Sequence, residues 1–400
     1  MSHLGYMEKL LDGVEVEWKE LNTLTKVLRG KRLVKSQLSD NEEFPVYHGG
    51  LQPLGYYNSS NRPADTVMII NVGASAGTVG YSSTKFWSSD GCFCIEHSKL
   101  LNNKYLYYVL IGYQHLLRSK VRLAGIPTLD SIIVERLQIP IPPLNIQAEI
   151  VRILDTFTEL TAELTAELTA ELTARQQQYA YYRDKLLTFE EGSVEWMPLG
   201  DISDFTYGYA AKAQESGDAR FVRITDINTN GKLYPADHMY IDISKESERY
   251  LLKKDDLLMA RTGATFGKTM IFEEDYPAIY AGFLIKLSLD PNIVNPKYYW
   301  HFAQSDLFWD QANKLVSGGG QPQFNANALK QVKLPVPYPS DTAKSLAEQA
   351  RIVLILDKFD AIASSLSEGL PREIELRQKQ YEYYRDLLLS FPKPEVVAHD

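Results

Sequence analysis

The segment QAEIVRILDTF at residues 147–157 returns as QARIVLILDKF at residues 349–359, and this repeat decides how the chain is organised. A second pair, RQQQYAYYRDKLLTF at 175–189 and RQKQYEYYRDLLLSF at 377–391, keeps the same offset of 202 residues. Self-similarity at a long, fixed spacing indicates internal duplication. Because both ends share one offset, the sequence predicts two copies of one long helix with equal length.

The segment at residues 147–189 has helical periodicity and contains no Gly or Pro. Forty-odd residues at 1.5 Å each predict a rod of roughly 60 Å. Inside it lies TELTAELTAELTAELTAR (158–175), whose leucines sweep an arc of about 120° at four-residue steps. We expect the rod to pack antiparallel on its copy at 349–391. These leucines are Leu160, Leu164, Leu168 and Leu172.

The tetrad repeat also has a simpler interpretation, in which it is a solvated low-complexity helix that expanded by slippage. The paired offset of 202 residues favours a structural role instead. The second rod is less regular, because Gly369 and Pro371 stand where the first has its repeats, and we expect them to break or kink it.

Shorter echoes between the rods predict one duplicated module with small insertions in its second copy. Their offsets climb steadily from 178 residues toward 202. The pairs are VEW at 16–18 and 194–196, GASAG at 73–77 and GATFG at 263–267, NKYLYYVL near 104 and PKYYWHF near 297, and IPIP at 139 and LPVP at 334. The chain therefore has the order helix end, module, helix, module, helix, which predicts a pseudo-two-fold body.

Each module alternates short β-branched or apolar runs with Gly, Asn and Asp turns, and then has one helical stretch. The predicted fold class is α+β, or mixed α/β, with two variable domains joined by two long antiparallel helices. The predicted divisions are an N-terminal segment completing the distal helical region (1–17), a first module (18–146), the central helix (147–193), a second module (194–340), and the distal helix with the C-terminal tail (341–400).

Composition limits the function. The 400 residues are 44% apolar, so the chain is long enough for two or more globular cores. Cys92 and Cys94 form a single CxC, which supports neither a disulfide framework nor a zinc site. No apolar run reaches the length of a membrane span, and the first residues lack the order of a signal peptide, so we expect a cytoplasmic protein.

Charge is distributed unevenly along the chain. The formal total is −9, yet residues 19–143 hold 14 Lys and Arg against 9 Asp and Glu, a local excess of +5. Residues 144–195 hold 4 against 10. The first module is therefore basic and the repeat helix acidic, so total charge does not exclude a DNA-binding protein.

No complete catalytic motif is present. GATFGKT (263–269) resembles a phosphate loop but has three residues between its glycines where that loop needs four. Its duplicate, GASAGTV, lacks the lysine, so we interpret both as tight turns. The methyltransferase Asn-Pro-Pro-aromatic motif is absent, and the seven histidines are scattered. We expect a non-catalytic chain that holds no metal and no cofactor of its own.

Basic and amide side chains in both modules are candidates for DNA contact. Arg reads guanine and Asn or Gln reads adenine through paired hydrogen bonds, while Lys mainly holds phosphates. Each residue taken singly is better explained as an ordinary solvated charge or turn amide, but the two basic clusters taken together favour DNA contact. The candidates are Lys26, Arg29, Lys31, Arg32, Lys35, Asn58, Asn61, Arg62, Arg118, Lys120 and Arg122 in the first module, and Lys212, Arg220, Arg223, Arg261, Lys268, Gln321, Gln323 and Asn325 in the second.

These motifs together resemble the specificity subunit of a type I restriction-modification system. The resemblance covers the whole chain in its organisation and is most specific over 147–196 and 349–395. It implies two target recognition domains that each read half of a split double-stranded DNA site. It also implies two modification subunits, which bring S-adenosylmethionine and methylate adenine, and restriction subunits, which use ATP and Mg²⁺.

The resemblance gives the tetrads a purpose, because each adds about 6 Å and about 40° to the rod that separates the two reading domains. Similar helix ends would dock the two modification subunits. The helix-pairing or docking candidates, which core packing would explain equally well, are Tyr179, Tyr181, Tyr182, Arg183, Tyr381, Tyr383, Tyr384 and Arg385. Two other classes stay open: a DNA-modifying enzyme with an unrecognised catalytic lobe, and a coiled-coil adaptor that binds protein only.

Overall fold

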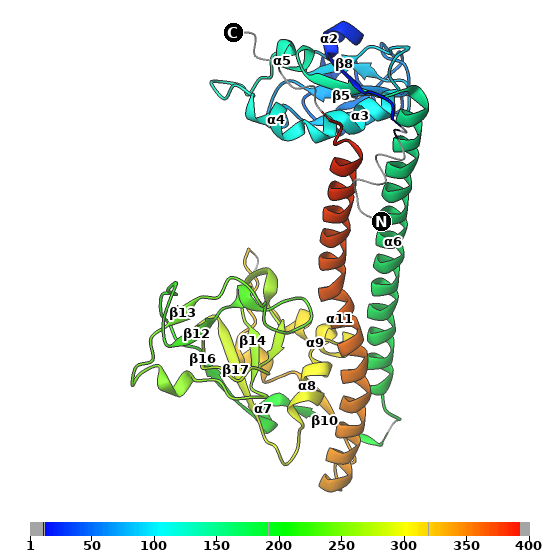
Figure 1. The fold of residues 1–400 in the computed structure, drawn as a ribbon. Helices are drawn as coiled ribbons and strands as arrows, with labels where there is room; N and C mark the ends of the chain where they lie inside the picture. Colours follow the sequence, from blue (N-terminus) through cyan, green and yellow to red (C-terminus); the bar gives the residue numbers. More distant parts are fainter. Residues whose placement is uncertain (1–10, 12, 191, 319, 393–400) are drawn as a thin grey trace. The chain divides into compact units, whose positions relative to one another are not determined.

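The computed structural model describes residues 11, 13–190, 192–318 and 320–392. Most of the predicted N-terminal segment at 1–17 therefore lies outside the described residues. The chain divides into two compact units (Figure 1), which are residues 1–165 with 372–400 and residues 166–371.

Unit 1 is built on two sheets and a separate strand pair. A four-stranded sheet has the order β2-β8-β5-β6, a three-stranded sheet has the order β4-β3-β7, and β1 pairs with β9. The strands are β1 Glu17–Glu20, β2 Val27–Arg29, β3 Phe44–Tyr47, β4 Gly55–Tyr57, β5 Thr66–Ile70, β6 Val79–Ser82, β7 Trp87–Ser88, β8 Cys92–Ile95 and β9 Gln138–Ile141. The short helices are α2 Leu21–Leu24, η1 Lys35–Gln37, α3 Asn103–Gly112, α4 Gln114–Ser119 and α5 Ser131–Glu135.

Unit 2 repeats this arrangement strand for strand. Its sheets have the orders β11-β17-β14-β15 and β13-β12-β16, and β10 pairs with β18. The strands are β10 Val194–Pro198, β11 Ser203–Tyr207, β12 Ala219–Val222, β13 Tyr240–Ile241, β14 Leu257–Ala260, β15 Thr269–Ile271, β16 Ala278–Tyr280, β17 Leu284–Leu289 and β18 Lys333–Pro337. The helices are α7 Leu199–Ile202, η2 Ile224–Asp226, η3 Glu248–Tyr250, η4 Gly263–Thr265, α8 Pro296–Phe302, α9 Asp306–Leu315 and α10 Ala326–Leu329.

The duplication extends to pairing direction. In each three-stranded sheet the middle strand is antiparallel to one neighbour and parallel to the other, as β3 is to β4 and β7, and β12 to β13 and β16. The mixed α+β class and the duplicated body are thus confirmed. The single helical stretch predicted in each module is instead two helices, because Ser305 caps the start of α9 and Tyr113 separates α3 from α4.

Two long helices complete the fold: α6 Leu144–Leu186, which follows Pro142 and Pro143, and α11 Thr342–Leu388, which Asp341 caps at the Lys344 amide. In unit 1 the ring of Phe157 stacks on Tyr384 at 5.1 Å, and in unit 2 the ring of Tyr182 stacks on Phe359 at 4.9 Å. A step of 25 residues up α6 thus matches 25 residues down α11. The helices pack antiparallel, as predicted.

The expected break near Gly369 and Pro371 is wrong, because α11 continues through both residues. Proline removes one amide donor from the helix interior, and neighbouring residues such as Glu373, Glu375, Arg377 and Lys379 are strong helix formers that restore the net propensity. Two ion pairs at i,i+4 spacing, Glu373 with Arg377 and Glu375 with Lys379, add modest support directly after the proline.

The tetrad repeat satisfies its own polar groups. The hydroxyls of Thr161, Thr165 and Thr173 each donate to the carbonyl four residues earlier, at 2.7 to 2.9 Å. The leucines differ in burial, since Leu160 is exposed while Leu164, Leu168 and Leu172 are half-buried. The repeat therefore makes few demands on residues outside the helix.

Candidate nucleic-acid interface

Each module anchors to its long helix through a buried glutamine. Gln147 accepts a hydrogen bond from the Asn102 amide at 2.8 Å and donates to the carbonyls of Leu100 and Pro142. Gln349 repeats this at the Asn295 amide, at 2.9 Å, and donates to the Ile293 carbonyl. These anchors were missed at the sequence level, although both glutamines open the repeated segment that organises the chain.

A second pair of anchors differs between the units. In unit 1 the Tyr108 hydroxyl donates to Asp155 of α6, which also pairs with Lys104 at 2.8 Å. In unit 2 the corresponding residue is His301, whose Nε2 lies 2.8 Å from Asp357 of α11. Burial lowers the pKa of His301, and its contact with Asp357 opposes that shift in part.

The two glycine segments form the same tight turn. Gly73 and Gly77 have φ of 87° and 83°, and Gly263 and Gly267 have φ of 70° and 75°, values that favour glycine. The Gly77 amide donates to Ile70, and that of Gly267 to Ala260, at 2.8 Å in both cases. The interpretation of these segments as turns is therefore confirmed. The Lys268 ammonium lies 3.5 Å from the Ile227 carbonyl.

A closing loop packs on each turn. The Gly73 amide donates to Pro127 at 2.9 Å, and the Gly263 amide donates to Pro322 at 3.0 Å. Both loops are pinched by a bridge, Arg122 to Thr128 and Ser317 to Gln323. In both modules the turn and the closing loop therefore form one edge. This edge lies at the end of an inner strand of the four-stranded sheet, which is β5 in unit 1 and β14 in unit 2.

The first basic cluster has a fixed backbone and exposed side chains. The Lys31 amide donates to Ser88 at 2.8 Å, and the Lys31 carbonyl accepts from the indole of Trp87 at 2.7 Å. The side chains make no hydrogen bond or ion pair with the described part of the chain. The members of this basic cluster are Lys26, Arg29, Lys31, Arg32 and Lys35.

Other candidates are also exposed. Arg118 donates to the Thr78 hydroxyl at 3.1 Å, and Arg122 pairs with Asp130 at 3.1 Å, an exposed ion pair of small energy. Gln323 is half-buried and holds the closing loop through its backbone. Four more candidates have exposed side chains with no partner in the described residues, and these are Asn58, Lys120, Lys212 and Gln321.

Several candidates already hold the fold together. Asn61 makes a two-way hydrogen bond with the backbone of Ser88, and Arg62 donates to the Asn61 and Arg29 carbonyls. Arg220 is buried and donates to Tyr276 and to the Tyr234 carbonyl. Arg223 pairs with Asp226 at 2.7 Å, and Asn325 caps α10. We leave these five out of the interface, because DNA contact would disrupt bonds that shape the module.

The helix tyrosines fall into two groups. Tyr182 and Tyr384 form the ring stacks between the helices, and Tyr179 is buried with its hydroxyl 2.8 Å from His301. Tyr181 and Tyr383 are 59% and 52% exposed. Tyr179, Tyr182 and Tyr384 therefore pack inside the fold, and core packing, the alternative explanation, applies to these three tyrosines. The remaining members are the half-buried Tyr381, Arg183 paired with Asp184, and Arg385 paired with Asp386.

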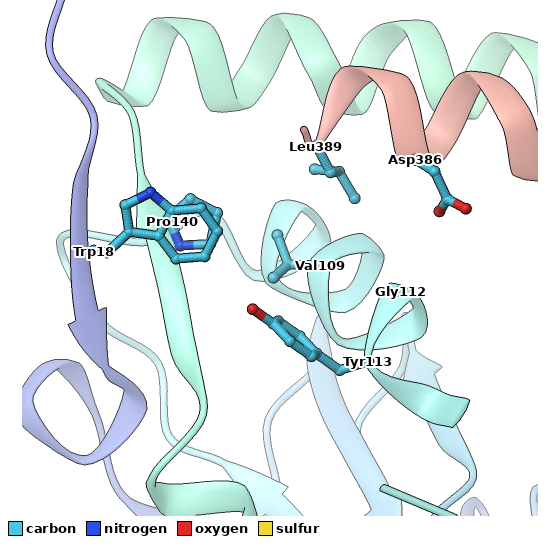
Figure 2. A pocket seen from close by; sticks show the side chains of 7 residues that line it. All are labelled: Trp18, Val109, Gly112, Tyr113, Pro140, Asp386 and Leu389. Carbon is cyan, nitrogen blue, oxygen red and sulfur yellow. The ribbon is translucent and has the colours of Figure 1, made fainter. Parts of the chain in front are cut away.

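A cavity of about 180 Å³ lies in unit 1 beside the end of α11. Figure 2 shows Trp18 and Pro140 on one side, Val109 and Tyr113 below, and Leu389, directly after α11, above. The Trp18 indole donates to the Pro392 carbonyl at 2.8 Å, which ties β1 to the end of α11. The cavity marks where the module meets the helix end that carries Tyr381 to Arg385.

The described residues include neither a metal-binding cluster nor a membrane-spanning helix. They contain no group of three or more His, Cys, Asp or Glu side chains placed to bind a metal ion. Within the same residues no helix is both long and apolar enough to cross a membrane.

Fold and site together define a duplicated α+β protein whose two similar domains each carry exposed basic and amide side chains, as nucleic-acid-recognition proteins do. The family model of the type I restriction modification DNA specificity domain matches residues 13–174 and 192–376. The chain belongs to this family. It is the DNA specificity subunit of a type I restriction-modification system, the non-catalytic component of that enzyme.

Relatives match along nearly the whole length. The specificity subunit of the Escherichia coli type I restriction enzyme EcoR124I/EcoR124II is 37% identical over 432 residues and covers 100% of both chains. A putative specificity subunit from Haemophilus influenzae, S.HindORF215P, is 35% identical over 400 residues and covers 96% of this chain and 98% of its own.

Solved structures share the fold. A chain solved for the assembly and conformational transition of the type I restriction-modification system gives a TM-score of 0.67 at 14% identity, with 95% of this chain and 99% of that chain covered. The HsdS subunit from Thermoanaerobacter tengcongensis gives 0.53 at 15% identity, with 94% and 97% covered.

Proposed function

We propose that each β-rich module is a target recognition domain that reads one half of a bipartite double-stranded DNA site. The observation that carries this proposal is a repeated backbone with unlike side chains: the strand orders, glycine turns and closing loops correspond, while the exposed polar residues near them differ. Two similar folds with different surface side chains suit two different half-sequences. The modules extend over residues 18–146 and 194–340.

Phosphate contact is assigned to the exposed lysines and arginines. The basic cluster of the first module has no acidic partner among the described residues, so its charges are available to a DNA backbone. Base contacts are assigned to the edge formed by the turn and the closing loop. In the second module this edge includes Arg261, Gln321 and Gln323, together with Lys268 below the turn.

The long helices set the distance between the half-sequences. Helix α6 starts in unit 1 and ends in unit 2, and the tetrads lie at the boundary between the units. A change in tetrad number therefore changes the rod by about 6 Å and about 40° per unit, against roughly 3.4 Å per base pair of DNA. The spacer between the half-sequences follows the tetrad count.

Two modification subunits dock at the duplicated helix ends. Tyr181 and Tyr383 are exposed aromatic residues related by the 202-residue repeat, and paired surfaces of this kind recruit two copies of one partner. S-adenosylmethionine acts in those subunits, and ATP with Mg²⁺ acts in the restriction subunits. The relative named for EcoR124I/EcoR124II is itself the specificity subunit of a type I restriction enzyme.

Genome-wide mapping of methylated adenine, in cells with and without this chain, tests the proposal. We expect one bipartite sequence to be methylated only when the chain is present. Methylation that persists in cells lacking the chain would contradict it, as would S-adenosylmethionine bound to the isolated chain. An assembly with no salt-dependent affinity for any duplex would favour a protein-only adaptor.

A further inference from the structure

Arg261 lies between two aromatic rings at the end of β14. Its guanidinium carbon is 5.2 Å from the ring centroid of Tyr207, the last residue of β11, and 5.5 Å from that of Phe283, which precedes β17. Tyr207 is 44% exposed and Phe283 is 57% exposed. A cation held between two rings that solvent also reaches is a stacked arginine with its outer edge free.

The hydrogen bonds of this arginine leave its fork, which is the pair of terminal guanidinium nitrogens, without a partner in the described chain. Nε donates to the Gly282 carbonyl at 3.1 Å, and within the described residues the two terminal nitrogens have no acceptor. No carboxylate of the described chain pairs with the guanidinium either. A folded protein commonly pairs a guanidinium with an acceptor or leaves it in water. The terminal nitrogens of Arg261 are stacked beside two rings and have no acceptor in the described chain, so they are well placed to donate to a ligand.

The backbone fixes the direction of the fork. The Arg261 amide donates to Phe283 at 3.1 Å, and its carbonyl accepts from Phe324 at 2.8 Å. The Tyr207 hydroxyl accepts from the Ala326 amide at 3.2 Å, which ties the ring to the start of α10. Three strand ends and the closing loop thus hold one side chain, and little side-chain freedom is left to lose on binding.

The geometry of the two terminal guanidinium nitrogens indicates which acceptor Arg261 would bind. Two parallel N–H donors match the O6 and N7 acceptors that guanine alone presents together in the major groove. A phosphate also accepts hydrogen bonds from arginine. A lysine can bind a phosphate without a fixed orientation, however, so two rings that orient the side chain give no advantage in phosphate contact. On the basis of the proposed recognition of DNA by the second module, we propose that Arg261 reads one guanine in the second half-sequence, with Tyr207 and Phe283 as its positioning residues.

The first module has no such device at this place in the fold. Asn71 follows β5 as Arg261 follows β14, and the same backbone bonds recur, from its amide to Gly91 and from Leu129 to its carbonyl. Asn71 is only 2% exposed, Gly91 replaces the phenylalanine, and Arg29 occupies the strand end that corresponds to Tyr207. The inference therefore applies to the second half-sequence alone.

The test uses the full modification complex and maps methylated sequences for the wild type and for Arg261→Lys, Arg261→Gln and Phe283→Leu. We expect the first half-sequence and the spacer to stay unchanged in all variants. At one guanine of the second half-sequence, Arg261→Gln and Arg261→Lys lower discrimination by about 10- to 100-fold. Phe283→Leu lowers it less, because the fork remains but is held more loosely. Lys245→Ala, an exposed lysine of unit 2 outside the proposed interface, is the matched charge control.

Each outcome decides the inference. Relaxed choice at a single guanine, with the other bases still required, supports it. An unchanged sequence at full methylation overturns it. Fluorescence anisotropy of the same complexes on target duplexes gives the second readout, and a uniform loss of affinity with a reduced salt dependence also overturns the inference, because it would make Arg261 a phosphate contact. If Arg261→Gln prevents folding, methylation at all sites disappears, and Arg261→Lys then decides the question. The proposed function fails separately, if the wild-type complex itself methylates no bipartite sequence.

Discussion

The two units share their strands, turns and anchors but differ at the residues beside the reading edge. Asn71, Gly91 and Arg29 in unit 1 correspond to Arg261, Phe283 and Tyr207 in unit 2, although the backbone bonds around them are the same. The comparison separates two requirements. Buried groups such as Gln147 and Gln349 occur in both units because the module must attach to its helix, while the edge residues differ, as expected if each module reads its own half-sequence.

The largest effect is expected from the rod that joins the units. Deleting Thr169 to Leu172 removes one tetrad, about 6 Å and about 40° of helix. We expect both half-sequences to stay the same while the spacer between them shortens, so that methylation at the original target is lost. Mapping of methylated adenine measures both properties. New half-sequences with the original spacer would show that the rod does not act independently of the modules.

Substitution of the buried glutamines tests whether they stabilise the two units to a similar extent. Gln147→Ala leaves one amide donor and two carbonyls of unit 1 without partners, and Gln349→Ala leaves one amide donor and one carbonyl of unit 2 without partners. Each change should lower the stability of its own unit by about 2–3 kcal/mol. Hydrogen exchange resolved by peptide measures this, with Leu at the same positions as the size-matched control. Loss of protection in the opposite unit alone would contradict the assignment.

Acid should affect unit 2 more than unit 1. Burial lowers the pKa of His301, so the unfolded chain takes up a proton first as pH falls below about 6.5. Stability from this residue is therefore present above that pH and is lost as pH falls toward the folded pKa. Tyr108, its counterpart, does not titrate there, since burial raises its pKa.

Calorimetric unfolding at pH 7.5 and 5.5 measures this difference, and His301→Gln should remove it. Equal acid sensitivity of both units in the wild type, or a persisting difference in the variant, would show that another group is responsible. Among the described residues, Asp357, Asp360, Lys297 and Tyr179 are the other titratable groups near the imidazole.

The smallest effect is expected from the exposed lysines. Lys31→Ala should reduce the slope of log affinity against log salt by about 1 and weaken all sequences alike. Fluorescence anisotropy of the modification complex on target and non-target duplexes measures this. Lys99→Ala, an exposed lysine of the same unit, is the control. A changed base preference in the Lys31→Ala variant would move that residue from phosphate contact to base contact.

Much of the fold was predictable because the duplicated segments occur twice in the sequence with matched spacing. The paired helices and both glycine turns follow from matched spacing and from the need of each turn for glycine at positive φ. The continuity of α11 was not predictable, since local propensity around Pro371 outweighs the missing amide donor.

The reading edge was harder to predict. Arg261 meets Tyr207 and Phe283 only because β11, β17 and β14 are neighbours in a particular register. Arg220 and Asn61 were included in the candidate set because side-chain type does not reveal burial. The residues that act together at an edge come from distant parts of the chain, and strand pairing has to be known before they can be grouped.

The threonines of the tetrads have a consequence for how this protein changes over generations. Thr161, Thr165 and Thr173 bond within their own helix, so a unit of four residues enters or leaves without stranding a polar group elsewhere. A copying slip of four codons should thus yield a chain that folds at once and addresses a different set of genomic sites. The bacterium that carries it would acquire a new pattern of self-marking in a single mutational event.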